Sequence, residues 1–136
     1  MPKKILLVDD DVDLVETVAQ ALSYHGFEVE KAHSGRDGLK KILEYKPDLL
    51  VLDVMMENDT AGFEVANQLR NRRTESRYSE FADLPIILLT AINQVTNSRF
   101  SLNEAQSFLP EIEDFITKPF KIDDLIARIK SLLDRE

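Results

Sequence analysis

The sequence predicts an α/β domain of the doubly wound kind, in which helices cover both faces of a parallel sheet. Five short apolar runs of strand length alternate along the chain with segments whose apolar residues recur at helical spacing. Most of these runs are apolar at consecutive positions, which is typical of strands buried on both faces. Regular alternation of strand and helix indicates βαβ units and therefore a central parallel sheet.

Length and composition narrow the class of protein. The 136 residues predict one domain, 1–136, and the net charge of −8 argues against a nucleic acid as partner. No apolar run approaches the roughly 18 residues of a membrane helix, and the N-terminus lacks the features of a signal peptide. The chain has no cysteine, which excludes disulfides and thiolate metal sites. We therefore expect a cytoplasmic protein that contacts neither membrane nor nucleic acid.

The first two strand-and-helix units occupy the N-terminal third of the chain. Residues Lys4–Val8 predict a buried strand, and the amphipathic helix that follows it ends near Gly26, which suits a left-handed cap. Residues Phe27–Ala32 alternate between apolar and polar, as in a strand at a sheet edge. Ser34 opens a second helix that runs to Glu44.

The remaining units follow in the same order. A third buried strand ends at Asp53, and the loop 55–62 precedes a third helix. Segment 70–80 is polar and lacks periodicity, which indicates a frayed helix end and a loop. A fourth strand starts at Pro85, and the long segment 91–113 predicts helix in its second half. A short fifth strand and a clearly periodic last helix cover residues 115–117 and 122–133.

Polar residues that can do chemistry stand where these strands end. They are Asp9, Asp10, Asp11, Asp53, Thr90 and Lys118. The carboxyl ends of parallel strands share one edge of the sheet, where open α/β sheets bind their ligands. Each residue also has an ordinary explanation, since the acid triplet can cap a helix and Asp53 can open a turn. Their convergence on one edge favours a shared site.

Several carboxylates at one edge require a counter-charge. Two carboxylates about 5 Å apart repel by roughly 3 kcal/mol at an effective dielectric constant of about 20. A hard divalent ion relieves this repulsion, and Mg²⁺ (or Mn²⁺ in its place) takes one or two carboxylates plus phosphate oxygens. A hydroxyl and an ammonium opposite the ion form a clamp for a phosphoryl group. An ionised carboxylate in that clamp can act as the nucleophile.

Four stretches resemble the receiver domain of two-component response regulators, of the stand-alone type. They are Ile-Leu-Leu-Val-Asp-Asp-Asp at 5–11, Asp-Leu-Leu-Val-Leu-Asp at 48–53, Pro-Ile-Ile-Leu-Leu-Thr-Ala at 85–91 and Phe-Ile-Thr-Lys-Pro-Phe at 115–120. The resemblance covers essentially the whole chain. It implies a flavodoxin-like (βα)5 fold with strand order 2-1-3-4-5.

The resemblance also implies roles for the residues at the strand ends. Asp53 would be the phospho-acceptor, and Thr90 and Lys118 would bind the phosphoryl oxygens. Phe115 would be the aromatic switch residue that acts with Thr90, although a plain core aromatic also fits it. The peptide bond between Lys118 and Pro119 would be cis.

The implied metal site consists of Asp9, Asp10, Asp53 and the backbone carbonyl of Met55, which would hold Mg²⁺. Asp11 is extra to this set and is expected to cap the first helix. The loop 55–62 departs from the family pattern. Glu57 stands where a proline is common, and the loop looks about one residue longer than usual.

These roles describe a phosphorylation switch in a two-component phosphorelay. The domain would receive its phosphoryl group from a sensor histidine kinase or a histidine phosphotransfer protein. It would then change its binding to a downstream protein through the fourth and fifth βα units, with a homodimer as one possible form. It would not be a turnover enzyme on external substrates.

Three alternatives compete with this interpretation. In a phosphohydrolase of the haloacid-dehalogenase type, Asp9 would be the nucleophile and Asp11 the general acid, but Asp13 stands where threonine or valine is expected. An interaction module without a switch is disfavoured by the intact acceptor, acids, threonine and lysine. A basic patch formed by the arginines at 70, 72, 73 and 77 is better explained as a solvated helix end.

Overall fold

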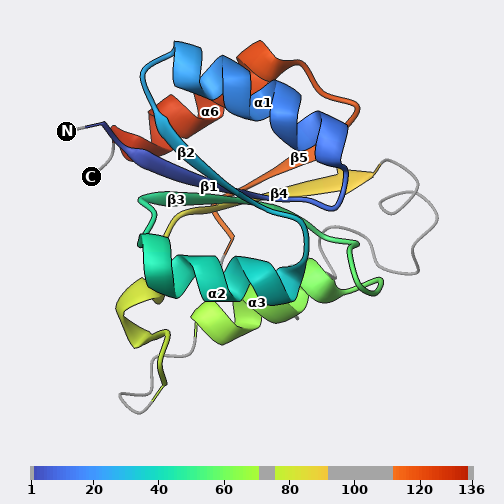
Figure 1. The fold of residues 1–136 in the computed structure, drawn as a ribbon, viewed down its shortest axis with the longest axis vertical. Coiled ribbons are helices and arrows are strands. Elements are labelled where there is room, and N and C mark those ends of the chain that lie inside the picture. The colour runs from blue at the N-terminus through green and yellow to red at the C-terminus, as the bar shows by residue number, and fades with distance from the viewer. Residues whose placement is uncertain (1, 71–75, 92–111, 135–136) are drawn as a thin grey trace.

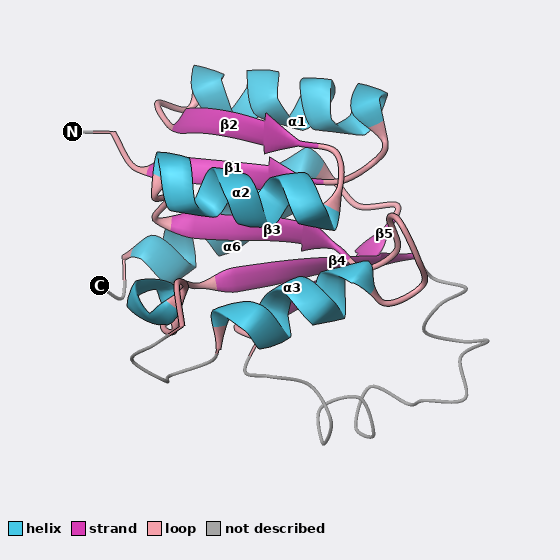
Figure 2. Cartoon of the chain, turned by 60° about the horizontal axis from the view of Figure 1, so that its bottom comes forward, coloured by secondary structure: helices cyan, strands magenta, loops and turns pink. Residues whose placement is uncertain are grey.

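The computed structural model describes residues 2–70, 76–91 and 112–134. They form a parallel sheet of order β2-β1-β3-β4-β5 with helices on both faces (Figure 1), which confirms the predicted fold and strand order. In Figure 2 the labelled strands lie side by side along the sheet. The strands are β1 Lys4–Val8, β2 Glu28–Ala32, β3 Leu49–Asp53, β4 Ile86–Ala91 and β5 Asp114–Lys118. The helices are α1 Val12–Tyr24, α2 Gly35–Tyr45, α3 Ala61–Leu69, α6 Ile122–Leu133 and the short 3-10 helix η1 Ser79–Phe81.

The sheet separates two apolar layers. Helices α1 and α6 cover one face and α2 and α3 cover the other (Figure 1). Neighbouring residues of a strand point to opposite faces, so Leu7 of β1 packs beneath α1 and α6 whereas Leu6 packs beneath α2 and α3. All five residues of β3 are buried, as expected for a strand in the middle of the sheet. Strand β2 lies at the sheet edge and is largely part-exposed, as its alternating sequence predicts.

Local caps start and stop the helices as the sequence predicts. The Asp11 carboxylate accepts a hydrogen bond from the Leu14 N–H at 3.1 Å, so Asp11 caps α1. The Ser34 hydroxyl accepts one from the Asp37 N–H at 3.0 Å and caps α2. Gly26 follows α1 with a φ of +91°, in the left-handed region that glycine reaches without strain.

Helix α3 begins earlier than predicted, because Ala61 and Gly62 belong to its first turn and not to the loop. The Gly62 N–H donates a hydrogen bond to the Val54 carbonyl at 2.8 Å. A Cβ on Gly62 would overlap the Asp53 carbonyl oxygen. Only glycine therefore allows the start of α3 to lie directly against the end of β3.

The prediction that Arg70 belongs to a solvated helix end is wrong. The Arg70 side chain is 8% exposed and forms an ion pair with Glu113 at 2.9 Å. It also donates to the Ala82 carbonyl at 3.1 Å. The pairing was not foreseeable, since Glu113 is 43 residues away and reaches Arg70 only once β4 and β5 have paired.

Three sequence predictions lie wholly or partly outside the described residues. They are the helix in the second half of 91–113, of which 92–111 are not described, residues 71–75 of the polar segment 70–80, and Arg72 and Arg73 of the basic cluster. Within the described ranges, no helix is long and apolar enough to span a bilayer.

Candidate functional site

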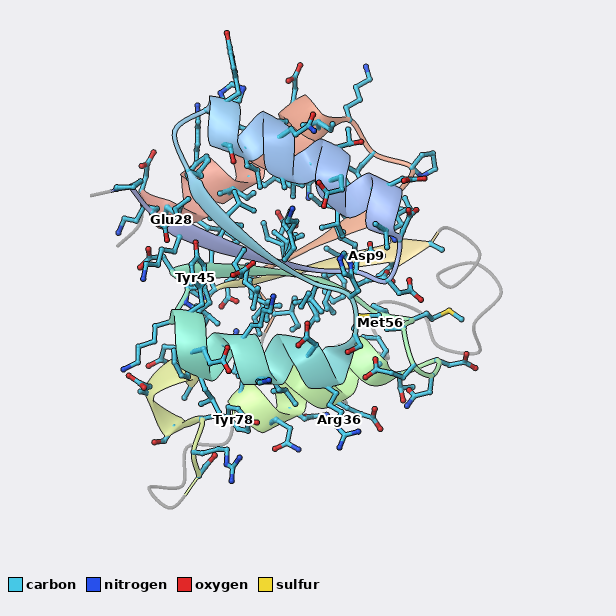
Figure 3. The ribbon with its side chains drawn as sticks, viewed as in Figure 1. Asp9, Glu28, Arg36, Tyr45, Met56 and Tyr78 are labelled. Carbon is cyan, nitrogen blue, oxygen red and sulfur yellow. The ribbon has the colours of Figure 1, made fainter. Side chains whose placement is uncertain are left out.

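The carboxyl ends of four strands bring the predicted site residues to one edge of the sheet. Asp9 follows β1, Asp53 ends β3, and Asp53 pairs in register with Leu89 of β4. Thr90 and Lys118 lie near the ends of β4 and β5, in register with Thr117 and Ala91 respectively. Figure 3 shows Asp9 at this edge, on the same side of the molecule as Met56 of the loop after β3.

Three carboxylates form a cluster with the donor set of a divalent metal site. One oxygen from each of Asp9, Asp10 and Asp53 lies within 4.8 Å of the other two. Asp9 is 2% exposed and Asp53 is 5% exposed, while Asp10 faces solvent. Hard oxygen donors in this number suit Mg²⁺, which keeps several waters and uses few protein carboxylates. The residues present therefore fit the ion.

Lys118 is a cation that faces this cluster. Its ammonium Nζ lies 2.7 Å from Asp9 Oδ2 and 3.3 Å from Asp53 Oδ1. Burial lowers the pKa of Lys118, but the hydrogen bond to Asp9 and the attraction of Asp53 outweigh it, and the net pKa is raised. The Lys118–Pro119 peptide bond that follows is cis, as the resemblance implies.

The Asp53 carboxyl has a raised pKa. Burial and the neighbouring charge of Asp9 raise the pKa of the Asp53 carboxyl to about 6, and Lys118 opposes the rise without cancelling it. Without a metal ion, this carboxyl is therefore partly protonated in mildly acidic solution. A divalent cation would favour its ionised and nucleophilic form.

Thr90 carries a buried hydroxyl that has no hydrogen-bond partner among the described residues. The residue is 5% exposed. Buried polar atoms are nearly always paired, so an exception at a strand end beside an acid cluster is compatible with the phosphoryl-binding role that the resemblance implies. Phe115 of β5 is half-buried and packs against the apolar layer beneath α2 and α3, so its position is compatible with either role considered for it.

The three consecutive acids Asp9, Asp10 and Asp11 make two kinds of contact. Asp9 and Asp10 face the cluster, whereas the Asp11 side chain is used to cap α1. The Asp11 N–H also donates to Asp9 Oδ1 at 2.9 Å, which helps to orient the Asp9 carboxylate. An Asp11 engaged as a cap is poorly placed to act as the general acid of a phosphohydrolase.

Glu57 has contacts that the sequence did not reveal. Its two carboxylate oxygens accept hydrogen bonds from the Gly35 N–H at 2.7 Å and from the Arg36 N–H at 2.9 Å. Burial opposes ionisation, but these backbone donors outweigh it and hold the pKa of Glu57 below its ordinary value. The sequence identified Glu57 as a departure from the family without assigning it a partner. The one hint in the sequence was the predicted start of α2, because the first N–H groups of a helix need acceptors and a carboxylate such as that of Glu57 can supply them.

Comparison with protein families and curated proteins identifies close relatives. The family model described as "Response regulator receiver domain" matches residues 5–130. Response regulator MprA of Mycolicibacterium vanbaalenii is 39% identical over 135 residues, which cover 99% of this chain and 52% of that protein. The MprA of Mycobacterium tuberculosis is 38% identical with the same coverage. The chain thus spans about half the length of the curated relatives that it matches.

Solved structures show the same architecture. A CheY-like response regulator receiver domain protein from Methanospirillum hungatei superposes with a TM-score of 0.76 at 30% identity, covering 99% of this chain and 96% of that chain. The chemotaxis response regulator CheY4 of Vibrio cholerae superposes with a TM-score of 0.77 at 26% identity, covering 96% and 98%.

Proposed function

The chain belongs to the response regulator receiver domain family, whose members are signalling switches, and we propose that it is switched by phosphorylation of Asp53. The observation that carries the proposal is the position of this carboxylate. It is buried at the end of β3, in contact with Lys118 and within an acid cluster that suits a divalent ion.

Receiver domains bind Mg²⁺ at an acidic pocket, and here Asp9, Asp10 and Asp53 would hold the ion together with the backbone carbonyl of Met55. When bound, the ion supplies positive charge that offsets the charge of the carboxylates and of the phosphoryl oxygens. Lys118 would contribute a second positive charge, because its ammonium lies within 3.3 Å of carboxylate oxygens of both Asp9 and Asp53.

In the proposed reaction, a carboxylate oxygen of Asp53 attacks the phosphorus of a phosphohistidine on a sensor histidine kinase or a histidine phosphotransfer protein. An O–P bond forms while the N–P bond breaks, and the bonding electrons leave with the imidazole, which takes up a proton. Lys118 binds a phosphoryl oxygen and stabilises its charge. The protein carries out only its own phosphorylation and dephosphorylation.

The signal then passes through Thr90. We propose that its hydroxyl, which has no partner among the described residues, donates a hydrogen bond to the new phosphoryl group and that Phe115 changes position with it. The fourth and fifth βα units would thereby present a different surface to a downstream protein, or to a second copy of the chain in a homodimer. The shift in population equals the difference in interaction energy between the two states. The switch would operate in the cytoplasm.

Intact-mass spectrometry after incubation with a small phosphodonor tests the proposal. The expected result is a gain of one phosphate that requires Mg²⁺ and is absent from Asp53→Asn. Asp59→Asn is the matched control, because Asp59 is an exposed acid that lies outside the acid cluster. Persistence of the label in Asp53→Asn, or turnover of many phosphodonor molecules with label on Asp9, would favour the phosphohydrolase instead.

A further inference from the structure

Glu57 connects two segments that lie far apart in the sequence. It belongs to the loop between β3 and α3, and its carboxylate accepts hydrogen bonds from the first two N–H groups of α2, at Gly35 and Arg36. The N-cap Ser34 satisfies the Asp37 N–H of the same helix. The loop acid therefore completes a cap whose remaining donors would otherwise depend on water. A carboxylate at this end of a helix is further stabilised by the helix dipole.

The backbone around Gly35 is fitted to this contact. A Cβ on Gly35 would lie 3.4 Å from the Glu57 carboxylate and 3.1 Å from a methyl group of Val65 in α3. The absence of a side chain thus leaves room for the first turn of α2, the first turns of α3 and the loop acid to meet.

The short connection between β2 and α2 also contacts the loop after β1. The Asp9 N–H donates to the Ala32 carbonyl at 3.1 Å, and the His33 ring nitrogen Nδ1 lies 3.1 Å from the Asp9 carbonyl oxygen. Residues 32–36 therefore contact both Asp9 and Glu57. They connect the loop after β1 with the loop after β3, and these are the two loops that would hold the ion.

Hydrogen bonds also join residues within the loop after β3. The Met56 N–H donates to the Asn58 carbonyl at 3.1 Å, and the Thr60 N–H donates to Asn58 Oδ1 at 2.9 Å. These bonds order the loop on both sides of Glu57, and Met55 lies two residues from Glu57 along the same backbone.

We infer that Glu57 is a positioning residue for the metal site. Through residues 32–36, it holds the loop that carries the Met55 carbonyl at the spacing from Asp9 that the ion requires. The inference rests on the proposed function only in its assignment of the Met55 carbonyl as a ligand. Partners that orient metal ligands without touching the metal commonly change affinity by about 10- to 100-fold when removed.

Calorimetric titration of the full chain with Mg²⁺, with no phosphodonor present, tests the inference. Glu57→Ala should weaken Mg²⁺ binding by about tenfold, and Glu57→Gln, which keeps one acceptor oxygen, by a smaller factor. Asp59→Asn removes the same charge from the same loop but has no hydrogen bond to α2, so it should bind Mg²⁺ like the wild type. At saturating Mg²⁺, the phosphorylation rate of Glu57→Ala should return to the wild-type rate.

Wild-type affinity in Glu57→Ala would overturn the inference. Equal weakening in Asp59→Asn would also overturn it, because charge and not the contact with α2 would then be responsible. If Glu57→Ala fails to fold, Glu57→Gln decides between these outcomes. A wild-type protein that binds Mg²⁺ but accepts no phosphate would contradict the proposed function alone, since the binding comparison would still test Glu57.

Discussion

The ammonium of Lys118 lies 2.7 Å from a carboxylate oxygen of Asp9, although the two residues are 109 positions apart in the sequence. The same ammonium lies 3.3 Å from Asp53. One cation from β5 therefore serves two buried acids from the ends of β1 and β3. In the metal-free protein it is the internal counter-charge of the site, and a divalent ion that enters must share these acids with it.

Replacing Lys118 by methionine should destabilise the metal-free protein. Removing one partner of a largely buried ion pair leaves an uncompensated charge, and we expect a loss of about 1–3 kcal/mol in the free energy of unfolding, since Lys118 keeps some solvent contact. Urea unfolding with a chelator present measures this loss. Lys31→Met is the control, because its ion pair with Glu16 is exposed and should contribute less than about 0.5 kcal/mol. Equal stability of Lys118→Met and the wild type would contradict the assignment.

Replacing Asp53 by asparagine should stabilise the metal-free protein in a pH-dependent manner. The pKa of Asp53 is raised from 3.8 to about 6 on folding, so the ionised carboxylate lowers stability above about pH 6, and this cost disappears below about pH 4. We expect Asp53→Asn to gain about 1–2 kcal/mol at pH 8 after allowance for solvent screening, and no gain at pH 4. Urea unfolding across this pH range measures the difference. A gain that is independent of pH would argue against an electrostatic cause.

Mg²⁺ should raise thermal stability through binding to the folded state, and Asp10 should be required for that response. A ligand at about one hundred times its dissociation constant adds about 2.7 kcal/mol to the free energy of unfolding. Asp10 is exposed, so Asp10→Asn should raise the metal-free melting temperature only slightly, by relieving repulsion within the cluster, while reducing the shift caused by Mg²⁺. Differential scanning calorimetry with and without Mg²⁺ provides both quantities. If Mg²⁺ raises the melting temperature of Asp10→Asn as much as that of the wild type, Asp10 is not a ligand of the ion.

Gly62→Ala should be far more damaging than Gly26→Ala. The new Cβ at position 62 would overlap the Asp53 carbonyl oxygen and force α3 away from the end of β3, at a cost of about 3 kcal/mol or more. Gly26 has open space around it, and alanine there would meet only the strain of a positive φ, about 1–2 kcal/mol. Denaturant unfolding ranks the two variants. Gly62→Ala should also lose phosphorylation, because the displaced backbone carries the proposed acceptor.

Arg70→Met should lower stability by removing an ion pair at the end of the sheet opposite the site. Arg70 pairs with Glu113, and the same Glu113 oxygen accepts a hydrogen bond from the Ile86 N–H at 2.7 Å. We expect a loss of about 1–3 kcal/mol in the free energy of unfolding, with Mg²⁺ affinity unchanged because the site lies at the other end of the strands. Lys46→Met removes an exposed pair with Glu80 and should have little effect. A change in Mg²⁺ affinity in Arg70→Met would show that the two ends of the sheet are coupled.

Local patterns explain why most of the fold was predictable. The first strand and the last helix have the bounds that apolar periodicity predicts, Lys4–Val8 and Ile122–Leu133. The cap at Asp11 and the left-handed Gly26 follow from residue type and position alone. Parallel pairing then requires the strand-end residues to share one edge, so the composition of the candidate site followed from the order of the elements.

The errors arose where a contact joins distant segments. The start of α3 depends on the close approach of Gly62 to Asp53, and periodicity contains no information about that approach. Arg70 looked like a solvated residue, because its partner Glu113 becomes a neighbour only when the sheet has formed. The contact of Glu57 with the start of α2 is of the same kind, since the two meet across the gap between separate βα units.

The sequence by itself therefore determined the doubly wound fold, the strand order through its family motifs, and the set of residues at the carboxyl edge of the sheet. Hydrophobic periodicity and helix caps act over a few residues and can be read along the chain. The tertiary structure decided the contacts at and beside that edge. It places Lys118 between Asp9 and Asp53, raises the pKa of Asp53, leaves the Thr90 hydroxyl without a partner among the described residues, and binds Glu57 to α2. These features depend on burial and on distances of a few ångströms between segments that only folding brings together.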